Sequence, residues 1–519
     1  MLKHDTFDLL VHSTDELESL LGEPLAERHL GTIYEGLLEY HLQPILPAVG
    51  WTIDLFNERG ERHRTGSYYT PDFVVQYIVD QTLKPVLDTA VAGKSSDAAK
   101  IASVPAVNVI DPAMGSGHFP VAAMEYIARY LTDLGVTPEN RSESVVSSPW
   151  SVASGTRSQI TGHGPLTTDE SGLAYWKRRV AQSCIYGVDL NPLAVDLAKL
   201  SVWLATAAKG RPLSFLDHHL RTGNALVGSV GREARDLGLG KQRPSRKKQA
   251  SMFDDPDFAR SISTAVGSMW LIEESAGSTI EQVREQERLY EDLRAELTRK
   301  YQKLADVATA RDFGLAVDTT LWKGLTAYLG KRGFEVPQYA AILEAAGDQA
   351  ERSRFFHWDL EFPEVFFDRH GQPLGDAVGF DAVIGNPPYA RQEQPAPIKP
   401  YLQEAYAETY HGAADLYVYF YQQGLRLLQR GGRMSYMVTN KWLRAGYGER
   451  LIAITRANQA ARRDTLDWLR TEFGVESAGQ RLESFAALDE AAFIEEVRKR
   501  RPKSARPRHY AWSAAWPTW

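Results

Sequence analysis

The chain has 519 residues, of which 43% are hydrophobic and 24% are charged, and its formal net charge is -7 at pH 7. This is the composition of a globular protein, and its length predicts two to four domains of about 150 residues each. The negative net charge argues against a uniformly basic coat for nucleic acid, no apolar run is long enough to predict a membrane span, and the single cysteine, Cys184, excludes an internal disulfide and a cysteine-rich zinc site.

The first predicted element is a helical segment over residues 1–63, where "LAERHLGTIYEGLLEYHL" carries apolar residues at helical spacing. We interpret it as an adapter or packing element. No signal peptide is predicted at the start, and one cysteine suits a reducing compartment, so we expect a cytoplasmic protein without a membrane segment.

Residues 64–240 predict one half of an α/β sheet. "RTGSYYTPDFVVQYIVDQTL" predicts a loop and an amphipathic helix with Pro71 at its first position, and 107–131 predicts a strand, a glycine loop and a helix. An insert over 135–172 is rich in Ser, Thr, Gly and Pro and is interpreted as a loop. Strand and helix resume over 184–208.

Residues 241–354 predict a basic loop, "KQRPSRKK" at 241–248, followed by a helical insertion. We interpret the loop as a solvated surface and the polar helix at 280–305 as an exposed arm. A second half of the sheet is predicted over 355–445, with a helix at 415–429 and a strand at 432–439, and a helical and basic tail over 446–519. The fold class is therefore α/β, with helices on both faces of the sheet.

The first predicted strand ends in an acid and a glycine loop, "DPAMGSGHF" at 111–119. With only Gly115 and Gly117 present, the G-x-G-x-x-G fingerprint of dinucleotide-binding folds is not met. Two glycines still permit close approach of the backbone to a small ligand, with the Asp111 carboxylate beside it. A plain strand-to-helix turn explains the same residues equally well.

The second predicted strand, "IYGVDLNP", ends in Asp189. A carboxylate at this place can accept hydrogen bonds from both hydroxyls of a ribose. The alternative is that Asp189 caps the helix that begins in "NPLAVDLAKL". In combination with the glycine loop, the ligand interpretation is favoured.

The segment "FDAVIGNPPY" at 380–389 predicts a short buried strand followed by Asn386, Pro387, Pro388 and Tyr389. Chemistry in open α/β sheets lies at the carboxyl ends of strands. The two prolines fix the backbone and supply no N–H, so the Asn386 carboxamide and the adjacent carbonyls are rigid acceptors. A proline turn with a packed tyrosine is the simpler alternative.

These motifs, in this order, resemble those of S-adenosylmethionine-dependent N6-adenine DNA methyltransferases, in particular the large Eco57I-like methylases of restriction-modification and BREX-type phage-defence systems. The resemblance spans roughly 30–445 and implies a Rossmann-like methyltransferase sheet and S-adenosylmethionine as cofactor. The residues that it implies around the cofactor are Tyr69, Thr70, Pro71, Asp111, Ala113, Gly115, Gly117, Phe119, Asp189 and Asn224. Asn224 stands where the family often has an acid.

The resemblance implies that a target adenine is flipped out of double-stranded DNA and stacked on Tyr389. The Asn386 side-chain oxygen and the Pro387 carbonyl would each accept one N–H of the adenine amine, which favours the pyramidal nitrogen of the transition state. No metal is expected. The alternatives are an inactive or partner-dependent DNA-binding subunit and, less favoured, a fused nuclease.

The segment 446–519 is shorter than the target-recognition region that the family adds after its catalytic sheet. We therefore expect that the chain does not select its DNA site alone. Either the chain is truncated, or a separate target-recognition or defence-system subunit supplies specificity, since phosphate contacts from a basic tail carry no sequence information.

Overall fold

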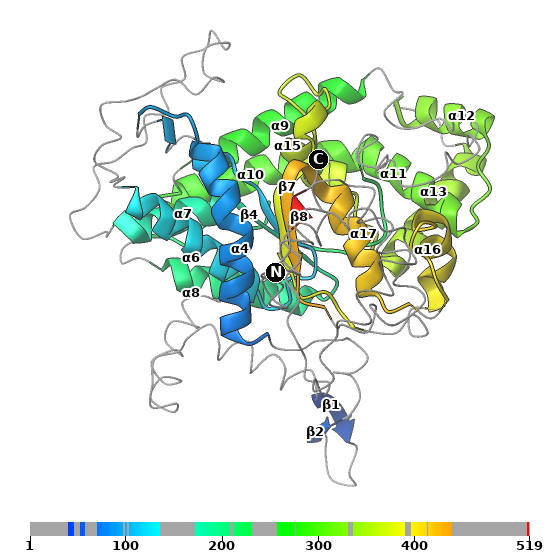
Figure 1. Ribbon diagram of the computed structural model, residues 1–519. Coiled ribbons are helices and arrows are strands. Elements are labelled where there is room, and N and C mark those ends of the chain that lie inside the picture. Colours follow the sequence, from blue (N-terminus) through cyan, green and yellow to red (C-terminus); the bar gives the residue numbers. More distant parts are fainter. Residues whose placement is uncertain are drawn as a thin grey trace, which may run out of the picture. The chain divides into compact units, whose positions relative to one another are not determined.

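The computed structural model describes 40–45, 52–57, 70–96, 99–100, 103–134, 172–207, 211–230, 257–275, 277–330, 336–389, 396–412, 414–438 and 516–517. The chain divides into two compact units (Figure 1). Unit 1 comprises residues 1–79, 87–223 and 273–287, and unit 2 comprises 80–86, 224–272 and 288–519. In the described part of the chain, no helix is long and apolar enough to cross a membrane.

Unit 1 contains three parallel strands, β3 (Val109–Asp111), β4 (Ile185–Asp189) and β5 (Leu220–Thr222), in the order β5-β4-β3. Helix α6 (His118–Asp133) follows β3, and α8 (Pro192–Thr206) follows β4. Helix α7 (Gly172–Ser183) precedes β4 and packs against α6 and α8. Because every strand runs in the same direction, the ends of β3 and β4 bring their terminal acids to one edge.

Unit 2 contains β6 (Phe380–Gly385) and β7 (Leu428–Tyr436), which are parallel with Gly385 opposite Tyr436. Helix α17 (Tyr417–Leu427) leads directly into β7, as a crossover between parallel strands requires. A short strand, β8 (Trp516–Pro517), pairs antiparallel with β7. Both units thus combine parallel strands with helices, and the predicted Rossmann-like α/β class is confirmed.

The remaining described elements are mostly helices. Their bounds are α4 (Asp72–Val91), α9 (Phe258–Glu274), α10 (Ile280–Leu297), the π-helix η5 (Thr298–Gln302), α11 (Lys303–Ala310), α12 (Thr319–Gly330), α13 (Pro337–Ser353), α14 (Trp358–Glu361), α15 (Pro363–Phe366) and α16 (Lys399–Ala405), with 3₁₀ turns η1 (Val104–Ala106), η6 (Arg311–Phe313), η7 (Gly375–Ala377) and η8 (Ala396–Ile398).

The predicted arm at 280–305 is helical, but it is not exposed on every side. Its buried residues in unit 2 recur at helical spacing: Leu293, Leu297, Tyr301 and Leu304 are each no more than 5% exposed. The polar composition of the segment did not indicate these buried positions, because long charged side chains occupy the other faces of α10. The arm is therefore a packed part of unit 2.

A buried ion pair joins α10 to α14. The Arg294 Nη2 atom lies 2.8 Å from Glu361 Oε1, and the two side chains are only 18% and 8% exposed. Arg294 Nη1 also donates to the Leu360 carbonyl at 3.2 Å. Glu361 therefore depends on Arg294 to compensate its lost hydration.

We expect Arg294→Ala to lower the free energy of unfolding by about 2–4 kcal/mol, because it leaves the buried Glu361 carboxylate without a cationic partner. Urea denaturation followed by circular dichroism measures this loss. The matched control is Arg288→Ala on the same helix, whose partner Asp292 is 69% exposed. The control should lower the free energy of unfolding by less than about 1 kcal/mol. An equal loss in both variants would contradict the stabilising role of the Arg294–Glu361 pair.

The predictions for the chain ends and inserts have different outcomes. The helical prediction for 1–63 is wrong over β1 (Tyr40–Ile45) and β2 (Thr52–Asn57), which pair as antiparallel strands. Pro44 opposes a continuing helix, and "TIDLF" alternates with the period of a strand. The insert at 135–171, the basic loop at 241–248 and the tail over 446–515 lie outside the described residues.

Candidate cofactor and catalytic loops

The segment that precedes the first helix of unit 1 begins with Thr70, which is 5% exposed. Helix α4 begins at Asp72, so Pro71, predicted as the first helical position, lies one position before the helix, and its carbonyl accepts the N–H groups of Val74 and Val75. Asp72 lies 3.5 Å from the His118 ring at the start of α6. The Thr70–Pro71 segment is thus connected to the glycine loop. Tyr69 lies outside the described residues.

The two glycines of the loop serve different purposes. Gly117, at φ +89°, precedes α6, and a Cβ atom there would lie 3.0 Å from the Cα atom of Ala198 on α8. Gly117 therefore permits close packing of loop and helix. Gly115 has φ +54°, and a Cβ atom there would meet nothing within 4 Å. The backbone at Gly115 borders open space, which suits the approach of a ligand.

Asp189 holds the glycine loop and does not cap a helix. Its Oδ2 atom accepts the Gly115 N–H at 2.9 Å, and its Oδ1 atom accepts the Asn191 N–H at 2.8 Å. The cap of α8 is Asn191, whose side chain accepts the Leu193 N–H at 3.0 Å. Asp189 therefore connects the glycine loop to the turn that precedes α8.

Asp111 is nearly fully buried at the end of β3, with 2% of its surface exposed. Its Oδ1 atom accepts the Ala113 N–H at 3.0 Å, and its Oδ2 atom has no hydrogen-bond partner among the described residues. Burial raises the pKa of Asp111 from 3.8 to about 8, and the nearby Asp189 charge adds to this increase. The carboxyl is therefore protonated at neutral pH when Oδ2 has no partner, and a ligand that brings donors or positive charge to Oδ2 would favour the carboxylate.

The sequence analysis missed two supports of this loop. Gly187 on β4 leaves room for the Met114 side chain, because a Cβ atom there would lie 2.1 Å from the Met114 sulfur, and the Met114 N–H donates to the Val188 carbonyl. The Ser201 hydroxyl on α8 donates to the Ser116 carbonyl at 2.9 Å. The helical pattern of α8 gives no signal for the second contact. Phe119, at 3% exposure, packs in the core.

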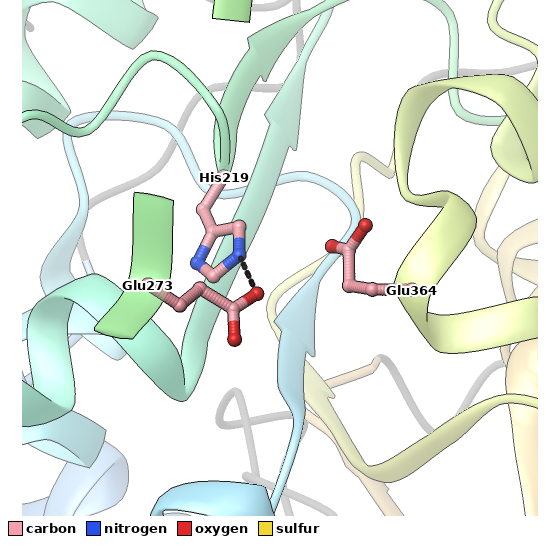
Figure 2. Close-up of side chains that lie close together, drawn as sticks. All are labelled: His219, Glu273 and Glu364. Carbon is pink, nitrogen blue, oxygen red and sulfur yellow. Dashed lines mark ion pairs between the residues drawn. The ribbon is translucent and has the colours of Figure 1, made fainter. Parts of the chain in front are cut away.

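A buried histidine and a partly exposed glutamate also lie close together in unit 1. His219 Nε2 lies 3.4 Å from Glu273 Oε1, and Figure 2 shows the two side chains facing one another. Burial lowers the pKa of His219 to about 3 and raises that of Glu273 to about 8, so both groups are neutral at pH 7. The His219 ring stacks on Tyr186 of β4 at 3.7 Å. This pair supports the strand core.

The candidate catalytic residues of unit 2 follow the carboxyl end of β6, as predicted. Asn386 is half-buried and Pro387 is buried. The Tyr389 hydroxyl lies 2.6 Å from Asn386 Oδ1 and 3.0 Å from the Met437 carbonyl oxygen, beyond the end of β7. Its ring is edge-on to Tyr417, with centroids 6.2 Å apart. Met437 was not predicted, because a backbone carbonyl leaves no signal in the sequence.

Asn224 also belongs to unit 2, where its polar groups connect two segments of backbone. Its N–H donates to the Arg354 carbonyl at 2.7 Å, and its Nδ2 atom donates to the Ser353 carbonyl at 3.3 Å. Its Oδ1 atom accepts the Leu226 N–H. Asn224 thus has a structural role, and its contact with a cofactor stays a prediction.

Comparisons with known proteins identify the family of the chain. A sequence model of the Eco57I restriction-modification methylase family matches residues 183–463, and a domain of unknown function (DUF8810) matches 445–516. A protein of Methanocaldococcus jannaschii named as a type II restriction enzyme and methyltransferase is 20% identical over 82% of this chain, which covers 36% of that protein. The type II methyltransferases M.XhoI of Xanthomonas vasicola and M.PaeR7I of Pseudomonas aeruginosa are 40% and 37% identical over 14% and 13% of the chain.

The aligned regions span 14% of M.XhoI and 12% of M.PaeR7I, so the chain matches at most about a third of the length of these relatives. The family match itself covers more than half of the chain and includes β4, β6 and the Asn-Pro-Pro-Tyr loop. The chain therefore belongs to the Eco57I restriction-modification methylase family.

Proposed function

We propose that the chain is a DNA methyltransferase that modifies the N6 amine of a flipped adenine in double-stranded DNA. The observation that carries this proposal is the Asn-Pro-Pro-Tyr segment at the carboxyl end of β6, with Asn386 Oδ1 held by a neighbouring hydroxyl. A rigid pair of acceptors suits an amine that must become pyramidal in order to react. Family membership and the names of the methyltransferase relatives support the reaction class.

Adenine's exocyclic amine is a poor nucleophile, because its lone pair is delocalised into the ring. The Asn386 side-chain oxygen and the Pro387 carbonyl would accept its two N–H groups and favour the pyramidal nitrogen. Pro387 and Pro388 limit backbone motion, so these acceptors lose little entropy when the base arrives. The Tyr389 ring supplies a stacking surface for a base outside the duplex.

S-adenosylmethionine is the proposed methyl donor, and it would supply an electrophilic methyl group. The loops of unit 1 fit such a ligand, because Asp111 Oδ2 is a buried polar atom without a hydrogen-bond partner in the described part, and a Cβ atom at Gly115 would meet nothing within 4 Å. The positive charge of the sulfonium would favour the ionised form of Asp111. Thr70 and Pro71, with Tyr69, would contact the methionine portion. Asp189 would accept the ribose hydroxyls, and Ala113, Gly117 and Phe119 shape the loop between them.

The proposed setting is a restriction-modification or phage-defence system, with a separate subunit or a further domain for target recognition. The alternative is a DNA-binding subunit without turnover. Long-read sequencing of host DNA with and without the gene detects methylated adenines directly. If N6-methyladenine at a specific motif disappears when the gene is removed, the methyltransferase function is supported. If the DNA is unchanged and the protein, co-expressed with its partner genes, also transfers no methyl group in vitro, the methyltransferase function is excluded.

We expect Asp189→Ala to weaken S-adenosylmethionine binding about tenfold to 100-fold, since it removes a charge-assisted acceptor worth roughly 1.5–3 kcal/mol. Isothermal calorimetry on the purified chain measures the affinity. The matched control is Asp196→Ala on α8, which should bind normally. Equal affinities for the wild type and Asp189→Ala would remove Asp189 from the site.

A further inference from the structure

The Asn386 side chain can adopt two orientations of nearly the same shape and opposite chemistry. In one, Oδ1 faces a given point and accepts hydrogen bonds, and in the other the NH₂ group faces that point and donates. The proposed reaction needs an acceptor toward the adenine amine. A neighbouring hydrogen-bonding group must therefore select the orientation of this carboxamide before the base binds.

The Tyr389 hydroxyl contacts the carboxamide oxygen. Its oxygen lies 2.6 Å from Asn386 Oδ1, a length typical of an O–H···O bond and shorter than the usual N–H···O bond. Burial raises the pKa of Tyr389 above its ordinary value, so the hydroxyl keeps its proton and remains a donor at neutral and mildly alkaline pH. The contact therefore favours the oxygen of Asn386 over its NH₂ group.

The hydroxyl is itself positioned by the end of the neighbouring strand. The Met437 carbonyl lies 3.0 Å from it, and the Met437 N–H donates to the Gly385 carbonyl at 2.9 Å, directly before Asn386. The fully buried ring of Tyr417 on α17 lies edge-on to the Tyr389 ring. The hydroxyl has a single proton, and the shorter contact assigns it to Asn386 Oδ1, with the Met437 carbonyl as the longer, weaker acceptor. The ring of Tyr389 contacts α17.

We propose that the Tyr389 hydroxyl is a positioning group that orients the Asn386 carboxamide with Oδ1 as the acceptor for the target amine. This assignment rests on the proposed function and goes beyond it, because the sequence analysis assigned Tyr389 a role only through the stacking of its ring. Asn386 Oδ1 has two lone pairs, so one can accept the hydroxyl while the other accepts the amine. The hydroxyl then need not leave when the base enters.

The test is the kinetics of Tyr389→Phe in two backgrounds, with wild-type Asn386 and with Asn386→Asp, assayed with any partner that the wild type requires. With Asn386, loss of the hydroxyl should lower kcat about three- to tenfold and change the KM for DNA less than about twofold, because the stacking ring is kept. A carboxylate has two equivalent oxygens and no orientation to select. In the Asn386→Asp background, Tyr389→Phe should therefore change kcat less than about twofold.

The matched control is Tyr410→Phe, which removes a hydroxyl from a tyrosine of unit 2 whose ring contacts Tyr419. It should leave kcat unchanged. If Asn386→Asp has no measurable activity, the comparison of kcat in two backgrounds is replaced by a binding experiment. The affinities of the wild type and of Tyr389→Phe are then measured for duplexes that carry adenine or purine at the methylated position. The wild type should prefer adenine, because only adenine has the amine, and Tyr389→Phe should lose most of this preference.

A wild-type kcat in Tyr389→Phe, or an equal loss in both backgrounds, would overturn the positioning role while the methyltransferase function stands. A wild-type protein that transfers no methyl group to DNA, even with its partners, would instead count against the proposed function. If no methyl transfer can be measured, a crystal structure still tests the contact between Tyr389 and Asn386. A Tyr389 hydroxyl bonded to Asn386 Nδ2, or to neither atom of the carboxamide, would refute it.

Discussion

Asn386→Ala is expected to lower kcat for methyl transfer at least about 100-fold, the usual effect of deleting one preorganised hydrogen-bonding group that acts on the transition state. The variant loses the oxygen that lies 2.6 Å from the Tyr389 hydroxyl at the end of β6. The affinity for S-adenosylmethionine should stay within about twofold of the wild type, because the proposed cofactor residues Asp111, Gly115 and Asp189 belong to unit 1. Incorporation of labelled methyl groups into DNA measures the first quantity, and calorimetry measures the second.

The informative control for Asn386→Ala is Asn386→Asp, which keeps an acceptor oxygen at the same place. It should retain more activity than the alanine variant. If Asn386→Ala methylated DNA at the wild-type rate, the amine would not depend on this side chain, and the proposed mechanism would be wrong.

Asp111→Asn is expected to stabilise unit 1 at pH 8 by about 3–5 kcal/mol while changing little at pH 4. The pKa of Asp111 is raised from 3.8 to about 8 in the folded chain. Between these values the unfolded chain loses the proton and the folded chain keeps it, so the stability of the wild type falls as the pH rises through this window. Asparagine does not ionise, and its Oδ1 atom can still accept the Ala113 N–H.

Because the pKa of Glu273 is also raised, to about 8, both proteins should lose stability with pH, and the difference between them is the quantity of interest. Urea titrations from pH 4 to 8.5, with hydrogen exchange of a peptide that contains β3 as the probe, measure unit 1 directly. Asp133→Asn changes an exposed carboxyl at the end of α6 and is the matched control. A difference between wild type and Asp111→Asn that does not grow with pH would show that Asp111 is not protonated in the fold.

Local patterns in the sequence were sufficient to predict the elements that carry the loops. The run before Asp111, the run before Asp189 and "FDAVIG" were predicted as strands, and β3, β4 and β6 confirm them. The helix at 415–429 and the strand at 432–439 correspond to α17 and β7, with shifts of a few residues at their ends. Hydrophobic period and turn residues act over a few positions, so a single sequence reveals them.

Prediction from the sequence was less successful where two local structures are compatible with the same residues. The N-terminal segment has helical spacing, yet residues 40–45 and 52–57 pair as strands, a choice that depends on pairing between the two segments. The polar helix at 280–305 was predicted as exposed, but Arg294 pairs with Glu361, 67 positions away. Composition alone does not show which face of such a helix is covered.

What the sequence by itself determined is the order of strands, glycine loop, acidic strand ends and Asn-Pro-Pro-Tyr, and with it the expected family. Only the tertiary structure decided what each polar group contacts. It showed that Asp189 accepts the N–H of Gly115, 74 positions away, and that the Tyr389 hydroxyl lies between Asn386 and the carbonyl of Met437, 48 positions from Tyr389. These contacts join residues that are distant in the chain, and the environment of a side chain, including the burial that raises the pKa of Asp111, exists only once those segments have packed together.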